Sequence, residues 1–165
     1  MGTTFRLRGR VLFFSSCLNV LKAQLRGDNL TAIPLGELRD DISTDEIIPL
    51  PAMVHFDEKL GRYPYTGLTV GGESPIKTDL IRELRIQVVV GGKRYGKGSS
   101  REHSVVAEMS AGVKIVFAES FERLYRQNAD NLGLWTSTDF SLLDRVLCGD
   151  EIDLEEFLIG RDAPA

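Results

Sequence analysis

Cysteine is scarce in this sequence, with only Cys17 and Cys148 among 165 residues. Two thiols cannot form the several disulfides that hold small secreted domains together. They are also too few for a structural zinc ion or an iron–sulfur cluster, which normally take about four Cys or His ligands. The sequence therefore predicts no metal site on this chain. Because cysteine is among the most often buried residue types, we expect two free, buried thiols in a reducing compartment.

Long apolar runs and an excess of basic residues are also missing. Apolar stretches such as Val11–Phe14 and Val88–Val90 are far short of the ~20 residues that cross a bilayer. No signal-peptide apolar region follows Arg6, Arg8 and Arg10. The formal charge of -4 comes from interspersed acidic and basic residues, so no basic face indicates a nucleic acid or an anionic membrane as partner. We expect a soluble, cytoplasmic protein.

The length and the hydrophobic content fit a single globular domain. Hydrophobic residues make up 42% of the sequence, which allows a sizeable core, and there is no internal repeat or low-complexity tract. Phe5–Phe14 has a strand-like composition, and Leu18–Leu25 is typical of a short helix. We interpret residues 1–38 as an N-terminal extension packed on the domain and residues 39–165 as that domain.

The central part of the chain predicts a βαβα unit. The β-branched segments Ile86–Val90 and Val113–Ala118 are typical of buried strands. Helices are predicted from Ser99, where residues 99–102 match a capping box, and from about Phe121. The apolar stripe of the first helix is expected to consist of Val105, Val106 and Met109. Strands joined in this way lie parallel, so the fold class is α/β and ligands bind beyond the carboxyl ends of the strands.

A long irregular segment, Leu50–Lys77, is rich in Pro, Gly and Tyr and has no sustained helical or strand period. A segment of this length without regular structure is uncommon unless it has a function. We therefore regard it as a candidate substrate-access loop. His55, Phe56 and Tyr65 are the substrate contacts expected within it.

A turn of small and basic residues follows the first strand of the predicted unit. In Gly96–Arg101 (GKGSSR), the glycines allow close approach of the backbone to a ligand, and the helix start offers unpaired N–H groups to carboxylates or phosphates. Arg101 adds a planar fork of donors that matches a carboxylate. Alternatively, Ser99 only caps the helix and Arg101 lies in solvent. The combination of these residues at one sheet edge favours a binding site.

A second motif overlaps this turn. Gly91–Lys97 has the spacing of a phosphate-binding P-loop between a strand and a helix. The P-loop requires a Ser or Thr hydroxyl for magnesium at the next position, where this chain has Gly98. The sequence therefore argues against a nucleoside-triphosphatase.

Three motifs, in chain order, resemble those of one family. Tyr95–His103 (YGKGSSREH) is similar to the Gly-Ser-Ser-Arg-Glu-His signature of the aconitase swivel domain, found also in the small subunit of 3-isopropylmalate dehydratase. Asp41–Pro49 (DISTDEIIP) resembles the Asp-x-x-Thr-Asp-x-Ile-Ile-Pro segment of that family, and Ser120–Gly133 resembles its Ser-Phe…Asn…Asn-x-Gly pattern. The resemblance spans Arg39 to Leu134, and three ordered motifs make coincidence improbable.

The resemblance implies an aconitase-type swivelling β/β/α domain and a hydro-lyase that dehydrates and rehydrates a hydroxy-di- or tricarboxylate. Matched residue by residue, Ser99 would be the base that removes the proton alpha to a carboxylate, and Asp45 would help to organise it. Ser100 and Arg101 would bind a substrate carboxylate beside Gly98. A helix N-terminus and a guanidinium are suited to stabilise the serine alkoxide that such a base requires.

The family also implies a [4Fe-4S] cluster that acts as a Lewis acid on the departing hydroxyl. Because this chain has two cysteines, we expect it to bind no cluster and a large partner subunit to supply one, in a heterodimer or larger assembly. The expected ligand is a small hydroxy acid, and neither a nucleic acid nor a membrane is expected as partner.

Lys97 departs from the family pattern, in which isopropylmalate small subunits commonly have Cys and aconitases an acidic residue. It either points into solvent, which we favour, or adds positive charge to the substrate site. 3-Isopropylmalate is the favoured substrate, and a homoaconitate-, methylmalate- or other aconitase-like substrate is the alternative. A non-catalytic carboxylate- or nucleotide-binding module is the alternative from another class. His103 is interpreted as a helix residue rather than a catalytic one.

Overall fold

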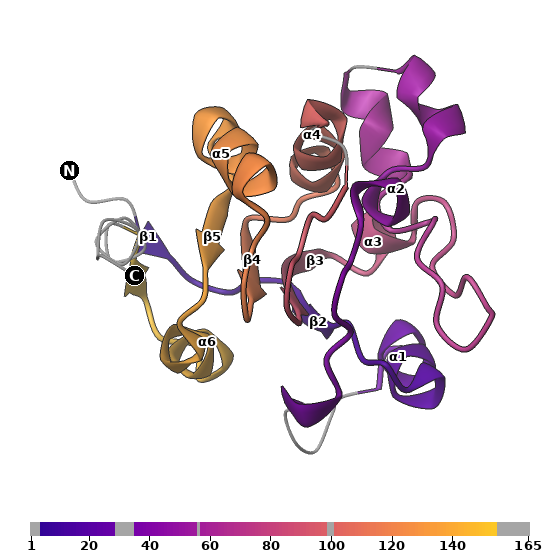
Figure 1. Cartoon of the computed structure of the whole chain (residues 1–165). Helices are drawn as coiled ribbons and strands as arrows, with labels where there is room; N and C mark the ends of the chain where they lie inside the picture. Colours follow the sequence, from indigo (N-terminus) through magenta and orange to yellow (C-terminus); the bar gives the residue numbers. More distant parts are fainter. Residues whose placement is uncertain (1–3, 29–34, 56, 99–100, 155–165) are drawn as a thin grey trace.

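A computed structural model describes residues 4–28, 35–55, 57–98 and 101–154 of the chain (Figure 1). Within these ranges, a parallel sheet has the strand order β2 (Arg10–Phe13), β3 (Ile86–Gly91), β4 (Ile115–Ala118) and β5 (Trp135–Ser137). A separate antiparallel pair consists of β1 (Thr4–Phe5) and β6 (Ile152–Asp153). The helices are α1 (Leu18–Leu25), α2 (Thr44–Ile47), α3 (Leu80–Glu83), α4 (Glu102–Ser110), α5 (Arg123–Leu132) and α6 (Phe140–Leu147).

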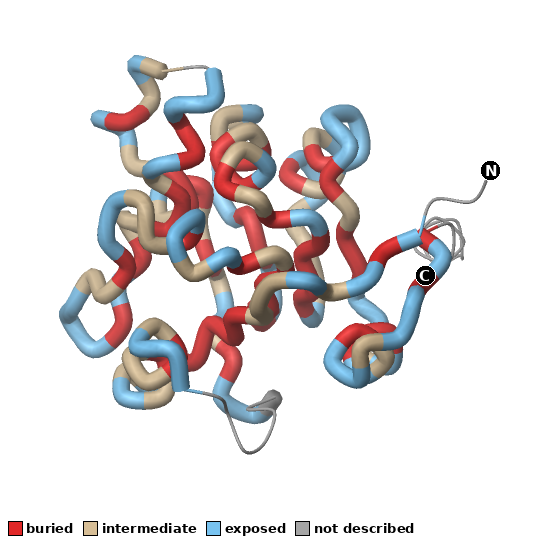
Figure 2. The backbone as a smooth tube through the Cα atoms, turned by 180° about the vertical axis from the view of Figure 1, so that it is seen from behind, coloured by how far each residue is buried: buried red, intermediate tan, exposed pale blue. Residues whose placement is uncertain are grey.

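The four-stranded sheet is buried on both faces (Figure 2). Val89 and Val116 contribute to one core together with side chains of α1, α4 and α5. Val88 and Phe117, one residue along each strand, contribute to a second core with α6, β1 and β6. Because successive strand residues point to opposite faces, this two-sided cover explains why β3 and β4 are almost continuously apolar.

The segment between α2 and α3 contains the 3-10 helices η2 (Leu50–Val54) and η3 (Glu58–Arg62) and otherwise turns. Leu60 of η3 and Ala52 of η2 pack with Ala107 of α4 in a third, smaller core. The predicted access loop therefore lies on the helix that follows the Gly96–Arg101 turn.

The α/β fold class and the parallel βαβα unit are confirmed. The helix predicted at Leu18–Leu25 has those bounds. The segment Phe5–Phe14 is not one strand but contributes to β1 and β2, and β2 places part of residues 1–38 beside β3 in the sheet. No helix among the described residues is long and apolar enough to cross a membrane.

Two local predictions are wrong. The helix does not begin at Ser99, because Arg101 is still extended (φ -124°, ψ 112°) and α4 begins at Glu102. Both cysteines are free, but they are exposed rather than buried. Cys17 precedes the first residue of α1 and Cys148 follows the last residue of α6, and such helix ends lie at the surface of the domain.

Candidate functional site

The three family-like motifs meet at the carboxyl end of the parallel sheet. The loop after β3 pairs with the segment before α2, since Gly96 N donates to Ile42 O at 2.7 Å and Thr44 N donates to Lys97 O at 2.8 Å. On its other side, Tyr95 N donates to Ser120 O at 3.0 Å, directly after β4. Residues that are distant in sequence are thus held together by backbone hydrogen bonds at the edge where ligands bind in such sheets.

The short helix α2 is held by a capping box that we did not anticipate. Glu46 N donates to Ser43 Oγ at 3.1 Å, and Ser43 N donates to the Glu46 carboxylate at 3.2 Å. Arg39 forms a bidentate ion pair with the same carboxylate, at 2.7 and 3.1 Å. These contacts fix the first turn of α2, where Asp45 lies.

Arg101 and Asp45 form an ion pair in which Arg101 Nη1 donates to Asp45 Oδ1. The two side chains differ in exposure, at 13% for Arg101 and 65% for Asp45. The guanidinium is therefore largely fixed within the protein, whereas the carboxylate is accessible from outside. The alternative that Arg101 lies in solvent is therefore wrong, and its role in binding substrate stays a prediction. Ser99 and Ser100 lie outside the described residues.

Two glycines of the turn have conformations that a side chain would disturb. Gly96 has φ +87°, and a Cβ there would lie 2.3 Å from the ring of Tyr125. Gly98 has φ +110°, and its Cβ would lie 3.3 Å from Thr44 Oγ1. Glycine is thus required at Gly96 by both sterics and backbone, and at Gly98 mainly by backbone.

Asp41 connects the Asp41–Pro49 segment to the loop after β3. Arg94 donates to both of its carboxylate oxygens, with Nη2 at 2.9 Å from Oδ2. This hydrogen bond is the main cause that lowers the pKa of Asp41 to about 2, and the same pair raises the pKa of Arg94. The Lys97 side chain is 56% exposed, with Nζ 3.7 Å from Asp41 Oδ1, in agreement with a largely solvated lysine.

Of the three residues of the access loop that were expected to contact substrate, the two that the structure describes differ in their burial. His55 is half-buried, and its ring stacks on Tyr63 with centroids 5.9 Å apart. No hydrogen bond or ion pair joins His55 to Asp45 or Arg101 in the part of the chain that the structure describes. Phe56 lies outside that part. Tyr65 was expected to contact substrate, and this is wrong because its side chain is fully buried.

Glu108 on α4 was missed by the sequence analysis. Its carboxylate is fully buried and accepts hydrogen bonds from the hydroxyls of Tyr65, Tyr95 and Tyr125. Met109, assigned to the apolar stripe, is instead exposed. The buried residues of α4 are Ser104, Val105, Ala107 and Glu108. Their helical spacing could have indicated a buried face that includes a glutamate.

His103 is a residue of α4, as predicted. Its pKa is lowered, first by burial and then by the positive charge of Arg101. This environment favours the neutral imidazole beside the site.

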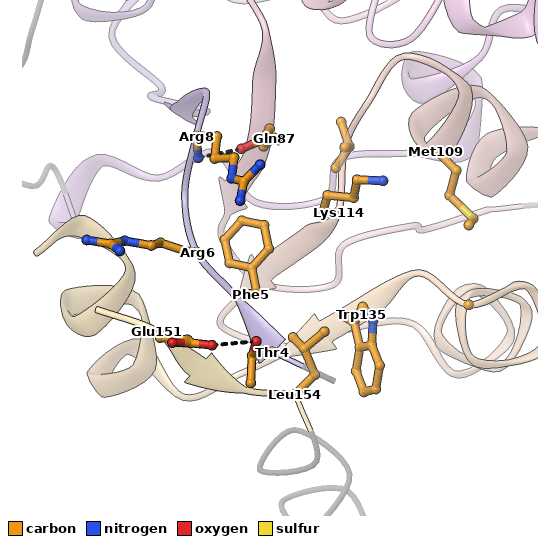
Figure 3. Close-up of a pocket in the computed structure, with 12 residues that line it drawn as sticks. Thr4, Phe5, Arg6, Arg8, Gln87, Met109, Lys114, Trp135, Glu151 and Leu154 are labelled. Atoms are coloured by element: carbon orange, nitrogen blue, oxygen red, sulfur yellow. Dashed lines mark hydrogen bonds between the residues drawn. The ribbon is translucent and has the colours of Figure 1, made fainter. Parts of the chain in front are cut away.

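A cavity of about 600 Å³ lies at the other end of the sheet (Figure 3). Its lining includes Gln87 and Trp135, near the amino ends of β3 and β5, and Lys114, which directly precedes β4. Arg6 and Arg8, labelled in Figure 3, also line it. The cavity is therefore separate from the edge that carries Asp45 and Arg101.

Comparison with known proteins assigns the chain to a protein family. The family of the aconitase C-terminal domain matches residues 78–138, which contain β3, β4 and the turn between them. The 3-isopropylmalate dehydratase small subunit of Halothermothrix orenii is 37% identical over 120 residues, 71% of this chain and 68% of that protein. The chain therefore belongs to the family of 3-isopropylmalate dehydratase small subunits.

Two further comparisons agree with this assignment. The 3-isopropylmalate dehydratase small subunit of Nitratidesulfovibrio vulgaris is 36% identical over 117 residues, and the match covers 70% of this chain. The chain spans 66% of the length of that relative. The crystal structure of 3-isopropylmalate dehydratase (leuD) from Methanocaldococcus jannaschii is 35% identical, with a TM-score of 0.52 over 71% of this chain and 66% of the other. The resemblance inferred from the motifs is confirmed.

Proposed function

We propose that this chain is the small subunit of a hydro-lyase that isomerises a 2-hydroxy dicarboxylate by dehydration and rehydration, with 3-isopropylmalate as substrate. The observation that carries the proposal is the placement of Arg101 beside Asp45 at the carboxyl edge of the sheet, where Gly98 also lies close to Thr44 of the Asp41–Pro49 motif. An edge of this kind binds anionic ligands, and the family membership supplies the chemistry.

The chain would supply the carboxylate-binding and proton-accepting half of the reaction. Arg101 presents several donors on a guanidinium that the protein largely covers, and one of them is used by Asp45. A substrate carboxylate could therefore be bound by the remaining donors, by Ser100 and by the N–H groups at the start of α4. Ser99 would accept the proton alpha to that carboxylate, stabilised by the same positive groups.

The iron–sulfur cluster of this reaction would be held by a partner. The chain has two cysteines, both exposed at helix ends, whereas a cluster normally takes about four thiolates. The described residues contain no group of three or more His, Cys, Asp or Glu that could hold a metal ion. The residues of this chain thus do not fit the cluster. We propose a large, cluster-bearing subunit as partner and a cytoplasmic location, which suits exposed free thiols.

Turnover after reconstitution tests the proposal. The chain is mixed with a cluster-bearing large subunit, and a panel of 2-hydroxy acids that includes isopropylmalate, homoaconitate and methylmalate is assayed. We expect turnover, with isopropylmalate preferred, and its loss in Ser99→Ala at an unchanged far-UV spectrum, because the N-cap of α4 is Arg101 and the helix does not need Ser99 as a cap. Near-normal turnover by Ser99→Ala would remove the base assignment. An inactive wild-type mixture would favour the binding-module alternative.

A further inference from the structure

A fully buried carboxylate, that of Glu108, accepts hydrogen bonds from three tyrosines close to the candidate site. Glu108 Oε2 accepts from Tyr65 and, at 2.7 Å, from Tyr95, and Oε1 accepts from Tyr125 at 2.5 Å. The hydroxyls of Tyr65 and Tyr95 are 3.1 Å apart. All four side chains have relative exposures of 2% or less. We call these four residues the Glu108 cluster.

Each tyrosine of the cluster belongs to a segment that builds the site. Tyr95 immediately precedes Gly96, and the ring of Tyr125 occupies the space beside Gly96 where a side chain would stand. Tyr65 N donates to Ile47 O at 2.8 Å, at the end of α2, the helix that carries Asp45. Glu108 itself is on α4, which begins one residue after Arg101. The cluster therefore connects the segment that carries Arg101 to the segment that carries Asp45.

Burying the Glu108 carboxylate costs free energy of folding, which suggests that the residue has a role other than stability. A buried carboxylate loses its hydration, and no ion pair compensates Glu108 within the described ranges. An apolar side chain of similar volume would avoid this cost. However, three hydroxyl groups that donate to one carboxylate define a single arrangement of the segments that carry them. Apolar packing would define this arrangement less strictly.

We propose that Glu108 is a positioning residue of the reaction, which holds the Gly96–Arg101 turn at a fixed place relative to Asp45 through Tyr65, Tyr95 and Tyr125. The inference rests on the proposed function for its catalytic consequence, but not for its structural one. The ionised carboxylate can accept from all three hydroxyls, whereas a protonated carboxyl needs an acceptor for its own proton. Positioning is therefore best when Glu108 is ionised.

The groups that face Glu108 are the three phenols, one from each element packed against it. Tyr65 comes from the loop after η3, Tyr95 from the loop after β3 and Tyr125 from α5. Burial raises the pKa of all three phenols, so they remain neutral donors near neutral pH. Burial also raises the pKa of Glu108 to about 7, so its protonation state changes in an accessible pH range.

The test compares Glu108→Gln with Glu83→Gln, which makes the same chemical change at an exposed residue of α3. In the reconstituted enzyme at pH 8, we expect kcat of Glu108→Gln to fall at least about tenfold with KM changed by less than about threefold, since small misplacements of reacting groups have such effects. The wild-type kcat should decrease as the pH falls through about 7, and this inflection should be absent in Glu108→Gln. Wild-type kcat and pH profile in folded Glu108→Gln would overturn the inference.

Hydrogen exchange in the isolated chain separates this inference from the proposed function. The amides of Gly96 and Thr44 report the docking of the turn on the α2 segment, because both donate across it. They should exchange at least about tenfold faster in Glu108→Gln than in Glu83→Gln, even if no partner yields turnover. If Glu108→Gln does not fold, Tyr125→Phe, which removes one hydroxyl, is measured in its place. Unchanged exchange at both amides would show that the cluster does not position the turn.

Discussion

Arg101 donates to Asp45 across a separation of 56 residues in sequence, and the arginine is the more buried partner of the pair. The exposed Asp45 carboxylate contacts the largely covered Arg101 guanidinium in the way that a substrate carboxylate would. Because an arginine has several donors in one plane, Asp45 and a substrate carboxylate could be held together or could exchange.

Replacing Arg101 by lysine should therefore raise KM and lower kcat/KM by about ten- to a hundredfold, since lysine keeps the charge but loses the planar fork. Steady-state kinetics of the reconstituted enzyme provide the measurement. Arg26→Lys is the matched control, because Arg26 is 67% exposed at the end of α1. If Arg101→Lys keeps wild-type kinetics, another residue recognises the carboxylate.

Gly96→Ala should destabilise the fold more than Gly98→Ala or Gly36→Ala. Its Cβ would lie 2.3 Å from the Tyr125 ring at φ +87°, so we expect a loss of at least about 2 kcal/mol in the free energy of unfolding. Gly98→Ala should lose less, because its nearest contact is 3.3 Å. Gly36→Ala, which meets nothing within 4 Å, should be nearly neutral in the same urea titration. Equal losses in all three variants would contradict this order.

Stability should fall as the pH rises through neutrality. Burial raises the pKa of Glu108 from 4.5 to about 7, so between these values the folded protein keeps a proton that the unfolded chain has released. The contribution is fully present below 4.5 and is lost as the pH rises through about 7, with a size on the order of 3 kcal/mol. Unfolding free energies between pH 5.5 and 8.5 should therefore decline more steeply in the wild type than in Glu108→Gln. If the free energies of unfolding of the two proteins changed in parallel with pH, the pH dependence of stability would come from a group other than Glu108.

Substrate preference is expected to depend on the first part of the access loop. Tyr65 is excluded as a contact, and a Cβ on Gly67 would lie 2.7 Å from Asp45 O, so both residues should be kept for the fold. Exchanging residues 50–63 with those of a relative of known preference should change substrate ratios by about ten- to a few hundredfold. His55→Ala is the single-residue version of this test. Unchanged ratios in both variants would assign specificity to another segment.

The parallel strands and the position of the site at their carboxyl edge could be predicted from the sequence, because apolar β-branched runs and glycine-rich turns are local signals. The Glu108 cluster could not, since its partners Tyr65, Tyr95 and Tyr125 are brought together only by tertiary packing. The capping box illustrates the same limit. Ser99-x-x-Glu and Ser43-x-x-Glu have the same pattern, but Ser43 is the N-cap of α2, whereas the N-cap of α4 is the extended Arg101 and not Ser99.

The isolated chain should bind no iron and show no hydro-lyase activity. Its two cysteines cannot furnish the usual thiolates of a cluster, and the Gly96–Arg101 turn with Asp45 would supply only the base and the carboxylate-binding groups. Activity should appear on mixing with a cluster-bearing large subunit, with the metal content of each chain measured before and after. Hydro-lyase activity of the metal-free chain alone would overturn the division of the site between two chains.

Hydrogen exchange on mixing should show where the two chains meet. If the reaction is divided between two chains as proposed, the reacting groups would lie in contact with the cluster, and the partner would cover the carboxyl edge of the sheet. We expect slower exchange at the first-turn amides of α2 and α4, which flank the Arg101–Asp45 pair. The strands β1 and β6, beside the cavity at the opposite end, should exchange as in the isolated chain. Protection of β1 and β6 without protection of α2 and α4 would place the partner at the wrong end for a shared site, and no protection with any cluster-bearing partner would favour a binding module.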